Sequence, residues 1–233
     1  MRRKGLFILG FIALLLVFGI VQSCKSNPEQ QLLSTYFHAI SLKDTSTMST
    51  MALQPESIDA VSWKIVTVSP EETTAFALAD LNQKELELKK NLENHVGPVM
   101  DAEDALYGAQ EELKASRTGG AKATAKKKVD EAQAKFDQER EIHRQLQKDY
   151  NDAKAAATRE EEIAIFSLGA GQLANIRDLT GSVLSKEVDV RVVAKDQTTK
   201  DYKFHLKKYD LKDEAANLTR RGRWIIVNFE PVS

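Results

Sequence analysis

Two heptad repeats separated by a short turn are the feature of this sequence that most restricts its fold. Mostly apolar residues recur at alternating steps of four and three from Leu81 to Leu113, and again from Ala125 to Ala157. This spacing places them along one stripe of an α-helix, as in a coiled coil. Residues 116–120 (SRTGG) lie between the two repeats and contain a Gly-Gly pair typical of a turn. The pattern therefore predicts two helices that fold back on each other as an antiparallel hairpin.

The residues of the two stripes set the register in which the two helices would face each other. The first seam comprises Leu81, Glu85, Leu88, Leu92, His95, Val99, Ala102, Leu106, Ala109 and Leu113, and the second seam comprises Ala125, Val129, Ala132, Phe136, Glu139, His143, Leu146, Tyr150, Ala153 and Ala157. If the chain folds back on itself at Gly119, Leu113 faces Ala125 and His95 faces His143. Gly97-Pro98 should kink or break the first helix, because proline lacks the backbone N–H that a helix interior needs.

The same register brings His95, His143 and Glu139 together. Two imidazoles and a carboxylate could bind a divalent metal. Histidines also occur as an ordinary polar layer between helices, and we favour that interpretation, so no metal and no other cofactor is expected.

Six cations gather around the predicted turn, with no acidic residue between Glu112 and Asp130. They are Lys114, Arg117, Lys122, Lys126, Lys127 and Lys128. A basic tip of this kind could bind an acidic protein, an anionic envelope polymer or anionic lipid. The alternative is that these side chains are simply solvated in an exposed loop.

The N-terminus combines a basic start, an uncharged apolar run over residues 5–21 and the single cysteine of the chain, Cys24. Residues 21–24 (VQSC) resemble the lipobox of bacterial lipoproteins. The resemblance implies a signal peptide at 1–23, lipid (such as palmitate) on Cys24, and a place in the bacterial cell envelope. Lys25 follows the cysteine, where some lipoproteins carry an inner-membrane retention aspartate, so the outer membrane is favoured in a two-membrane cell. The alternatives are an uncleaved apolar anchor and ordinary secretion.

Charge and cysteine content exclude several function classes. Loss of Arg2, Arg3 and Lys4 with the signal would change the formal net charge from −1 to −4. Such an acidic chain does not suit general nucleic-acid binding. With Cys24 lipid-modified, no thiol remains for disulfides, thiol catalysis or cysteine metal sites.

The segments that flank the repeats mix one helix with alternating strands. Asn27-Pro28 should start a helix, with an apolar stripe that includes Leu33, Tyr36 and Phe37. Four strands are expected, at 60–68, 182–194, around 202–206 and at 223–229. The first helix and the final strand GRWIIVNFEP resemble cystatin-like or NTF2-like lipoprotein domains, which wrap a curved sheet around a long helix. The resemblance implies a cone that Tyr36, Trp63, Phe204 and Trp224 could line as a pocket, although core packing is the favoured role of these residues.

No segment carries a catalytic signature. Residues 169–174 (GAGQLA) resemble a dinucleotide fingerprint, but they follow the heptad region and no repeated βαβ units surround them. We expect these glycines to end the helix. His38 and His205 should face solvent, which does not suit a buried general base.

The expected fold is therefore α+β, with a small curved antiparallel sheet packed on an N-terminal helix and a long coiled-coil hairpin inserted. The expected parts are the signal peptide at 1–23, the α+β domain at 24–79 and 167–233, and the hairpin at 80–166. The expected function is that of a non-enzymatic envelope lipoprotein that interacts through its helical hairpin. The alternative is an NTF2-like ligand-binding protein or enzyme. An efflux-adaptor-like subunit is disfavoured, because no lipoyl half-motifs flank the hairpin.

Overall fold

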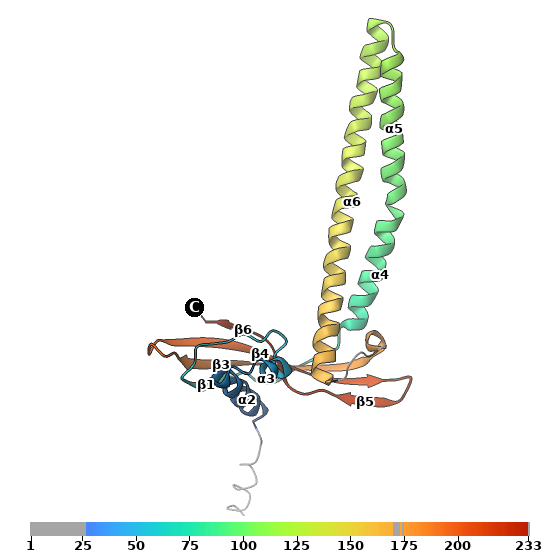
Figure 1. Cartoon of the computed structure of the whole chain (residues 1–233). Coiled ribbons are helices and arrows are strands. Elements are labelled where there is room, and N and C mark those ends of the chain that lie inside the picture. The colour runs from blue at the N-terminus through green and yellow to red at the C-terminus, as the bar shows by residue number, and fades with distance from the viewer. Residues whose placement is uncertain (1–26, 170–172, 174, 233) are drawn as a thin grey trace, which may run out of the picture. The chain divides into compact units, whose positions relative to one another are not determined.

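The computed structural model describes residues 27–169, 173 and 175–232 (Figure 1). The fold is α+β, and its antiparallel sheet curls into a half-barrel. Contacts divide the chain into two compact units, of which one contains residues up to 72, 184–208 and those from 224 onward. The other contains residues 73–183 and 209–223. Cys24 and the predicted signal segment lie outside the described residues. No helix in the described part of the chain is both long and apolar enough to span a membrane.

The sheet has six strands, two more than the sequence pattern predicts. They are β1 (Ser62–Val68), β2 (Glu72–Ala75), β3 (Thr180–Val193), β4 (Thr199–Asp213), β5 (Leu218–Arg221) and β6 (Ile225–Pro231). The main order is β1-β3-β4-β5, with β2 paired to β3 and β6 paired to β4. The two unpredicted strands, β2 and β5, are only four residues long and almost fully exposed. Their residues therefore show no alternation that sequence reasoning could detect.

Two irregularities in the ladders of the first unit help the sheet to curl. The β1–β3 register shifts between Ile65 and Thr67, and the β4–β6 register shifts between His205 and Leu206. An extra residue in one strand bends that strand and increases its twist. The concave face of the sheet can therefore close around a helix.

The N-terminal helix α2 (Pro28–Leu42) supplies the core of the first unit with aromatic side chains. Its buried stripe includes Leu33, Tyr36 and Phe37, as the sequence spacing predicts. The stripe packs against Val190 and Phe204 of the sheet, among other buried residues of one apolar cluster. Fully burying one such large side chain contributes on the order of 2 kcal/mol.

The ends of α2 differ in detail from expectation. Asn27 occupies the N-cap position, but its side chain makes no capping hydrogen bond. The helix ends at Lys43 in the left-handed conformation (φ 56°), and a second short helix, α3 (Thr45–Met51), follows at once. Asp44 caps α3 by accepting a hydrogen bond from the Thr47 backbone N–H at 3.0 Å. The sequence pattern does not indicate α3, because its TSTMSTM sequence carries only one buried residue, Met48.

Three helices form the heptad region of the second unit, and they are called the arm helices below. They are α4 (Leu78–Asn94), α5 (Val96–Ala115) and α6 (Gly119–Leu168). The longest of them, α6, packs against both α4 and α5 (Figure 1). Every residue of the first and second seams is buried or half-buried.

Local sequence explains where the arm helices are interrupted. The break between α4 and α5 falls at His95, close to the predicted position, because Pro98 cannot donate to the Asn94 carbonyl of the preceding turn. The turn between α5 and α6 is shorter than predicted. Thr118 caps α6 by accepting from the Ala121 N–H at 3.4 Å, so Gly119 already belongs to the helix. Gly169, with φ +60°, ends α6 as expected.

The C-terminal end of α6 packs closely on the strands of the second unit. The buried Ser167 hydroxyl accepts from the Tyr209 N–H at 3.2 Å and donates to the Arg223 carbonyl at 2.8 Å. The Tyr209 hydroxyl donates to Glu160 at 2.8 Å. Burial, with the neighbouring Glu160 carboxylate, raises the pKa of Tyr209, so this hydroxyl stays protonated.

Candidate functional site

The α5–α6 turn carries the six predicted cations, and all of them are exposed. Three of them form ion pairs with carboxylates of α5 or α6. Lys114 Nζ lies 2.6 Å from Glu111, Lys127 Nζ lies 3.7 Å from Glu131, and Lys128 Nζ lies 2.6 Å from Glu112. The hydrogen bond to Glu111 raises the pKa of Lys114. Half of the predicted basic tip is thus neutralised by its own neighbours.

The other three cations of this tip are Arg117, Lys122 and Lys126. None of them has an ion-pair partner among the residues that the structure describes. Arg117 lies on the connection between α5 and α6, and Lys122 and Lys126 lie in the first two turns of α6. The backbone N–H groups at this end of α6 already give a partial positive charge. We call Arg117, Lys122 and Lys126 the open tip. An anionic group would meet little competition there from the protein's own acids.

The histidine pair lies where the seam register predicts. The ring centroids of His95 and His143 are 5.9 Å apart and the rings are stacked, with an interplanar angle of 27°. His95 Nε2 also lies 3.0 Å from Glu139 Oε2. No group of three or more His, Cys, Asp and Glu side chains among the described residues is arranged to hold a metal. His95, His143 and Glu139 form a polar contact between α6 and the break that separates α4 from α5.

The candidate pocket residues of the first unit contribute to its packed core. Tyr36 and Phe204 have no exposed surface. Trp63 stacks on Phe37 at 4.7 Å, and Trp224 packs partly buried against the same cluster. Side chains that lined an open pocket would keep surface accessible to a water-sized probe, and Tyr36 and Phe204 do not.

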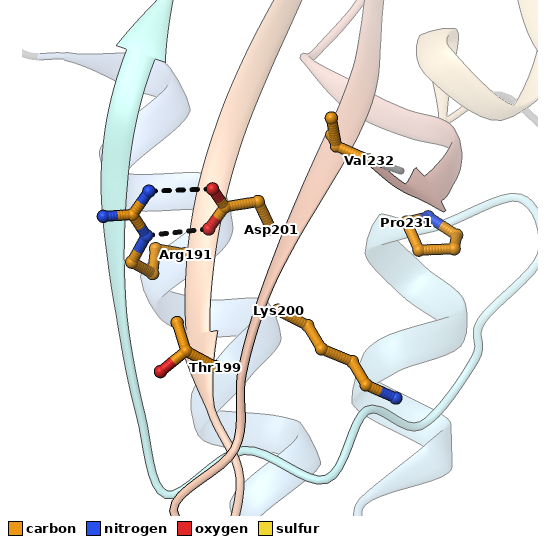
Figure 2. Close-up of a pocket in the computed structure, with 6 residues that line it drawn as sticks. All are labelled: Arg191, Thr199, Lys200, Asp201, Pro231 and Val232. Carbon is orange, nitrogen blue, oxygen red and sulfur yellow. Dashed lines mark hydrogen bonds and ion pairs between the residues drawn. The ribbon is translucent and has the colours of Figure 1, made fainter.

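Two hollows do occur in the first unit, and neither follows from the sequence analysis. One has a volume of about 780 Å³, and in it Arg191 donates two hydrogen bonds of 2.8 Å to Asp201. Figure 2 shows that Lys200 extends away from this pair. This bidentate bond lowers the pKa of Asp201 and raises that of Arg191. Arg191 and Asp201 neutralise each other, whereas Lys200 forms no ion pair with any residue that the structure describes.

The second hollow, of about 530 Å³, is lined in part by Lys186, Glu71 and Glu187. Lys186 Nζ lies 3.5 Å from Glu29 and 3.4 Å from Glu71, and 5.1 Å from the centre of the Trp224 ring. The largest contribution, a hydrogen bond from Lys203, lowers the pKa of Glu187. Lys186 and Glu187 of this hollow are therefore each paired with an opposite charge. Alternation along β3 could have indicated an outward charged face, but not which charges meet.

The remaining candidates are placed as follows. His38 is exposed, as predicted. His205 is half-buried and lies 3.5 Å from Glu187 and 3.9 Å from Glu230. Cys24 and most of the 169–174 fingerprint segment lie outside the described residues.

Comparisons with protein-family models, with curated proteins and with solved structures find no match to this chain.

Proposed function

We propose that this chain is a membrane-anchored lipoprotein of the bacterial cell envelope that acts as a non-enzymatic interaction or scaffold protein. In this proposal residues 1–23 are a signal peptide, Cys24 carries the lipid, and the outer membrane is the favoured location. The first unit is a domain like the cystatin-like or NTF2-like domains, and the arm helices form a coiled-coil hairpin inserted into it. The partner is an acidic protein or an anionic envelope polymer.

The open tip is the observation that carries the proposal. Arg117, Lys122 and Lys126 are exposed cations without a described carboxylate partner, whereas neighbouring lysines of the same turn are paired. They lie at the end of the arm helices where residues 116–118 connect α5 to α6. A scaffold protein needs such an accessible, charged contact surface more than it needs an enclosed pocket.

The packing of the first unit supports interaction over ligand binding. An NTF2-like ligand site would use the cone around Tyr36 and Phe204. Both side chains are instead fully buried against other aromatic rings, with Tyr36 and Phe204 centroids 6.4 Å apart in an edge-on contact.

Cross-linking from the open tip in intact cells tests the proposal. A photo-reactive amino acid at position 123, an exposed alanine beside the open tip, should trap a specific envelope component that mass spectrometry can identify. Reversal of the open tip (Arg117→Glu, Lys122→Glu, Lys126→Glu) should reduce this adduct at least several-fold.

The paired lysines provide the matched control. Lys114→Glu with Lys127→Glu and Lys128→Glu makes the same change of charge at three cations that already have partners, so it should reduce the adduct less. Equal loss in both variants would argue for general electrostatic attraction and against the open tip. An adduct that survives reversal of the open tip would contradict the proposal.

A further inference from the structure

The end of the second unit where α5 meets α6 carries more positive than negative charge. Residues 111–131 contain six cations and four acids, so this end keeps a formal net charge of +2. Three of the acids are paired with the lysines described above, and the fourth, Asp130, forms no ion pair within the part of the chain that the structure describes. The three cations of the open tip therefore face a single uncommitted carboxylate.

The open tip is placed against the electrostatic preference of its own helix. Acidic residues suit the first turn of a helix, and α2 and α4 carry Glu29 and Asp80 there. The first turn of α6 has no acidic residue, and its fourth residue is Lys122. Lys126 lies one turn further along the same face of α6, so the two ammonium groups repel each other. The fold gains nothing from these cations, whereas a bound anion would relieve the repulsion between them.

The side chains between the cations are all small. From position 114 to position 128, every residue that is not lysine or arginine is alanine, glycine, serine or threonine. Protein–protein interfaces place aromatic or large aliphatic side chains at their desolvated centre. This surface offers no such side chain, so it suits a partner that is held by charge alone.

The size of this end also restricts the partner. Among the described elements of the second unit, only α5 and α6 reach it (Figure 1). Two packed helices measure roughly 20 Å by 10 Å in cross-section, which is about 200 Å². A standard protein–protein interface takes about 800 Å² from each partner. A flexible chain of anionic groups needs no such area, because each cation contacts it separately.

We propose that the open tip binds a linear polyanion, which is a flexible polymer with repeated anionic groups, and not a folded acidic protein. The inference rests on the proposed function, since it names the class of partner that the same surface takes. Arg117, Lys122 and Lys126 supply the exposed charges, and the polymer releases its counterions when they bind. An isolated anion, by contrast, would gain only one contact at a time.

Binding of long-chain inorganic polyphosphate to the full chain, purified in a non-ionic detergent, tests the inference. Calorimetric titration at several salt concentrations gives the slope of log K against log salt. Each cation that contacts a single-stranded polyanion contributes about 0.7 to this slope. Arg117→Gln with Lys122→Gln and Lys126→Gln should therefore weaken binding at least several-fold at low salt and reduce the slope by about 2.

The paired lysines again supply the matched control. Lys114→Gln with Lys127→Gln and Lys128→Gln removes the same charge, but these ammonium groups are already neutralised by carboxylates. The slope should consequently fall by less than half as much as in the open-tip variant. All six residues are exposed, so the folded chain tolerates both sets of changes, and circular dichroism verifies this.

Two comparisons separate a polymer from other anionic partners. Inorganic phosphate, at the same total phosphate concentration as the polymer, should bind far more weakly, because it lacks linked anions. In intact cells, the cross-linked adduct at position 123 should be heterogeneous in size and should resist protease digestion.

Three outcomes would overturn the inference. They are an equal fall in slope for the two sets of variants, equally tight binding of inorganic phosphate, and an adduct at position 123 that consists of one discrete protein or lipid. If open-tip reversal removes such a discrete adduct, the inference fails while the proposed function stands. If reversal changes neither the adduct nor polyphosphate binding, the proposed function fails as well.

Discussion

Gly222 lies at a tightly packed position of the second unit, with no room for a side chain. A Cβ atom there would come within 2.4 Å of Ser167 Oγ and 2.7 Å of the Tyr209 carbonyl oxygen. Neither atom is free to move, because Ser167 Oγ is hydrogen-bonded on both sides and the other atom belongs to the backbone of β4.

We therefore expect Gly222→Ala to lower the free energy of unfolding by about 1–3 kcal/mol, as overpacking usually does. Thermal or urea unfolding measures it. Gly120→Ala is the matched control, since Gly120 lies in α6 with open space around it. That change should stabilise the chain by about 0.5–1 kcal/mol. A neutral Gly222→Ala would mean that the Ser167 contact is not tight.

Asp44 links stability to pH through the cap of α3. Hydrogen bonds from the Thr47 side chain and backbone lower the pKa of Asp44 below its usual value. A carboxylate with a lowered pKa in the folded state stabilises that state above its unfolded pKa, near 3.9. The contribution is lost as the pH falls through the folded pKa.

Asp44→Ala should accordingly unfold at a lower temperature than the parent chain at pH 7. The difference between the two chains should shrink as the pH falls below about 4. Melting followed by circular dichroism at pH 7, 5 and 3 measures it. A difference that stays constant down to pH 3 would contradict a cap that depends on the charge.

Arg177 connects three secondary-structure elements that are far apart in sequence. Its guanidinium bonds Glu161 of α6 at 2.8 Å, and Glu85 and Asn82 of α4 at 3.0 and 2.9 Å. Arg177 belongs to the 3₁₀ helix Ile176–Asp178. The bond to Glu161, the largest contribution, and the bond to Glu85 together raise the pKa of Arg177, so it is charged at every ordinary pH.

Arg177→Gln should destabilise the second unit by about 1–3 kcal/mol, since it leaves two partly buried carboxylates without their cation. Arg177→Lys should recover only part of the loss, because lysine lacks the planar fork that bonds Glu161 through Nε and Glu85 through Nη1. Urea unfolding measures the loss, and hydrogen exchange of α4 locates it. Full recovery with lysine would mean that charge alone matters.

For the whole molecule, the proposed lipid on Cys24 decides where the arm helices act. Cys24→Ala should move most of the chain from the membrane fraction to the soluble fraction, if the proposed lipid is the anchor. Fractionation with immunoblotting measures this, and metabolic labelling with palmitate should mark the parent chain only. If the variant stays in the membrane without label, the apolar segment itself is the anchor.

The sequence predicts those parts of the fold that repeat locally. The β3 residues Val188, Val190 and Val192 are buried as their alternation indicates, and the stripe of α2 is buried as its spacing indicates. Such periodicity depends only on the spacing of apolar residues along the chain. It can therefore be recognised without knowing the surface on which the element packs. The short strands β2 and β5 lack it, since only their pairing partners make them strands.

For the candidate surfaces too, some features follow from the sequence and others only from the tertiary structure. The sequence alone determined that six cations gather at one turn, that His95 faces His143, and that a cysteine follows an apolar N-terminal run. Only the tertiary structure decided that Lys128 is neutralised by Glu112 while Arg117 is left open, and that Arg177 reaches Glu85 and Glu161. Composition and spacing report which charges are near in sequence. Pairing depends on which side chains the fold brings within about 3 Å of each other, and that distance is set by packing between elements.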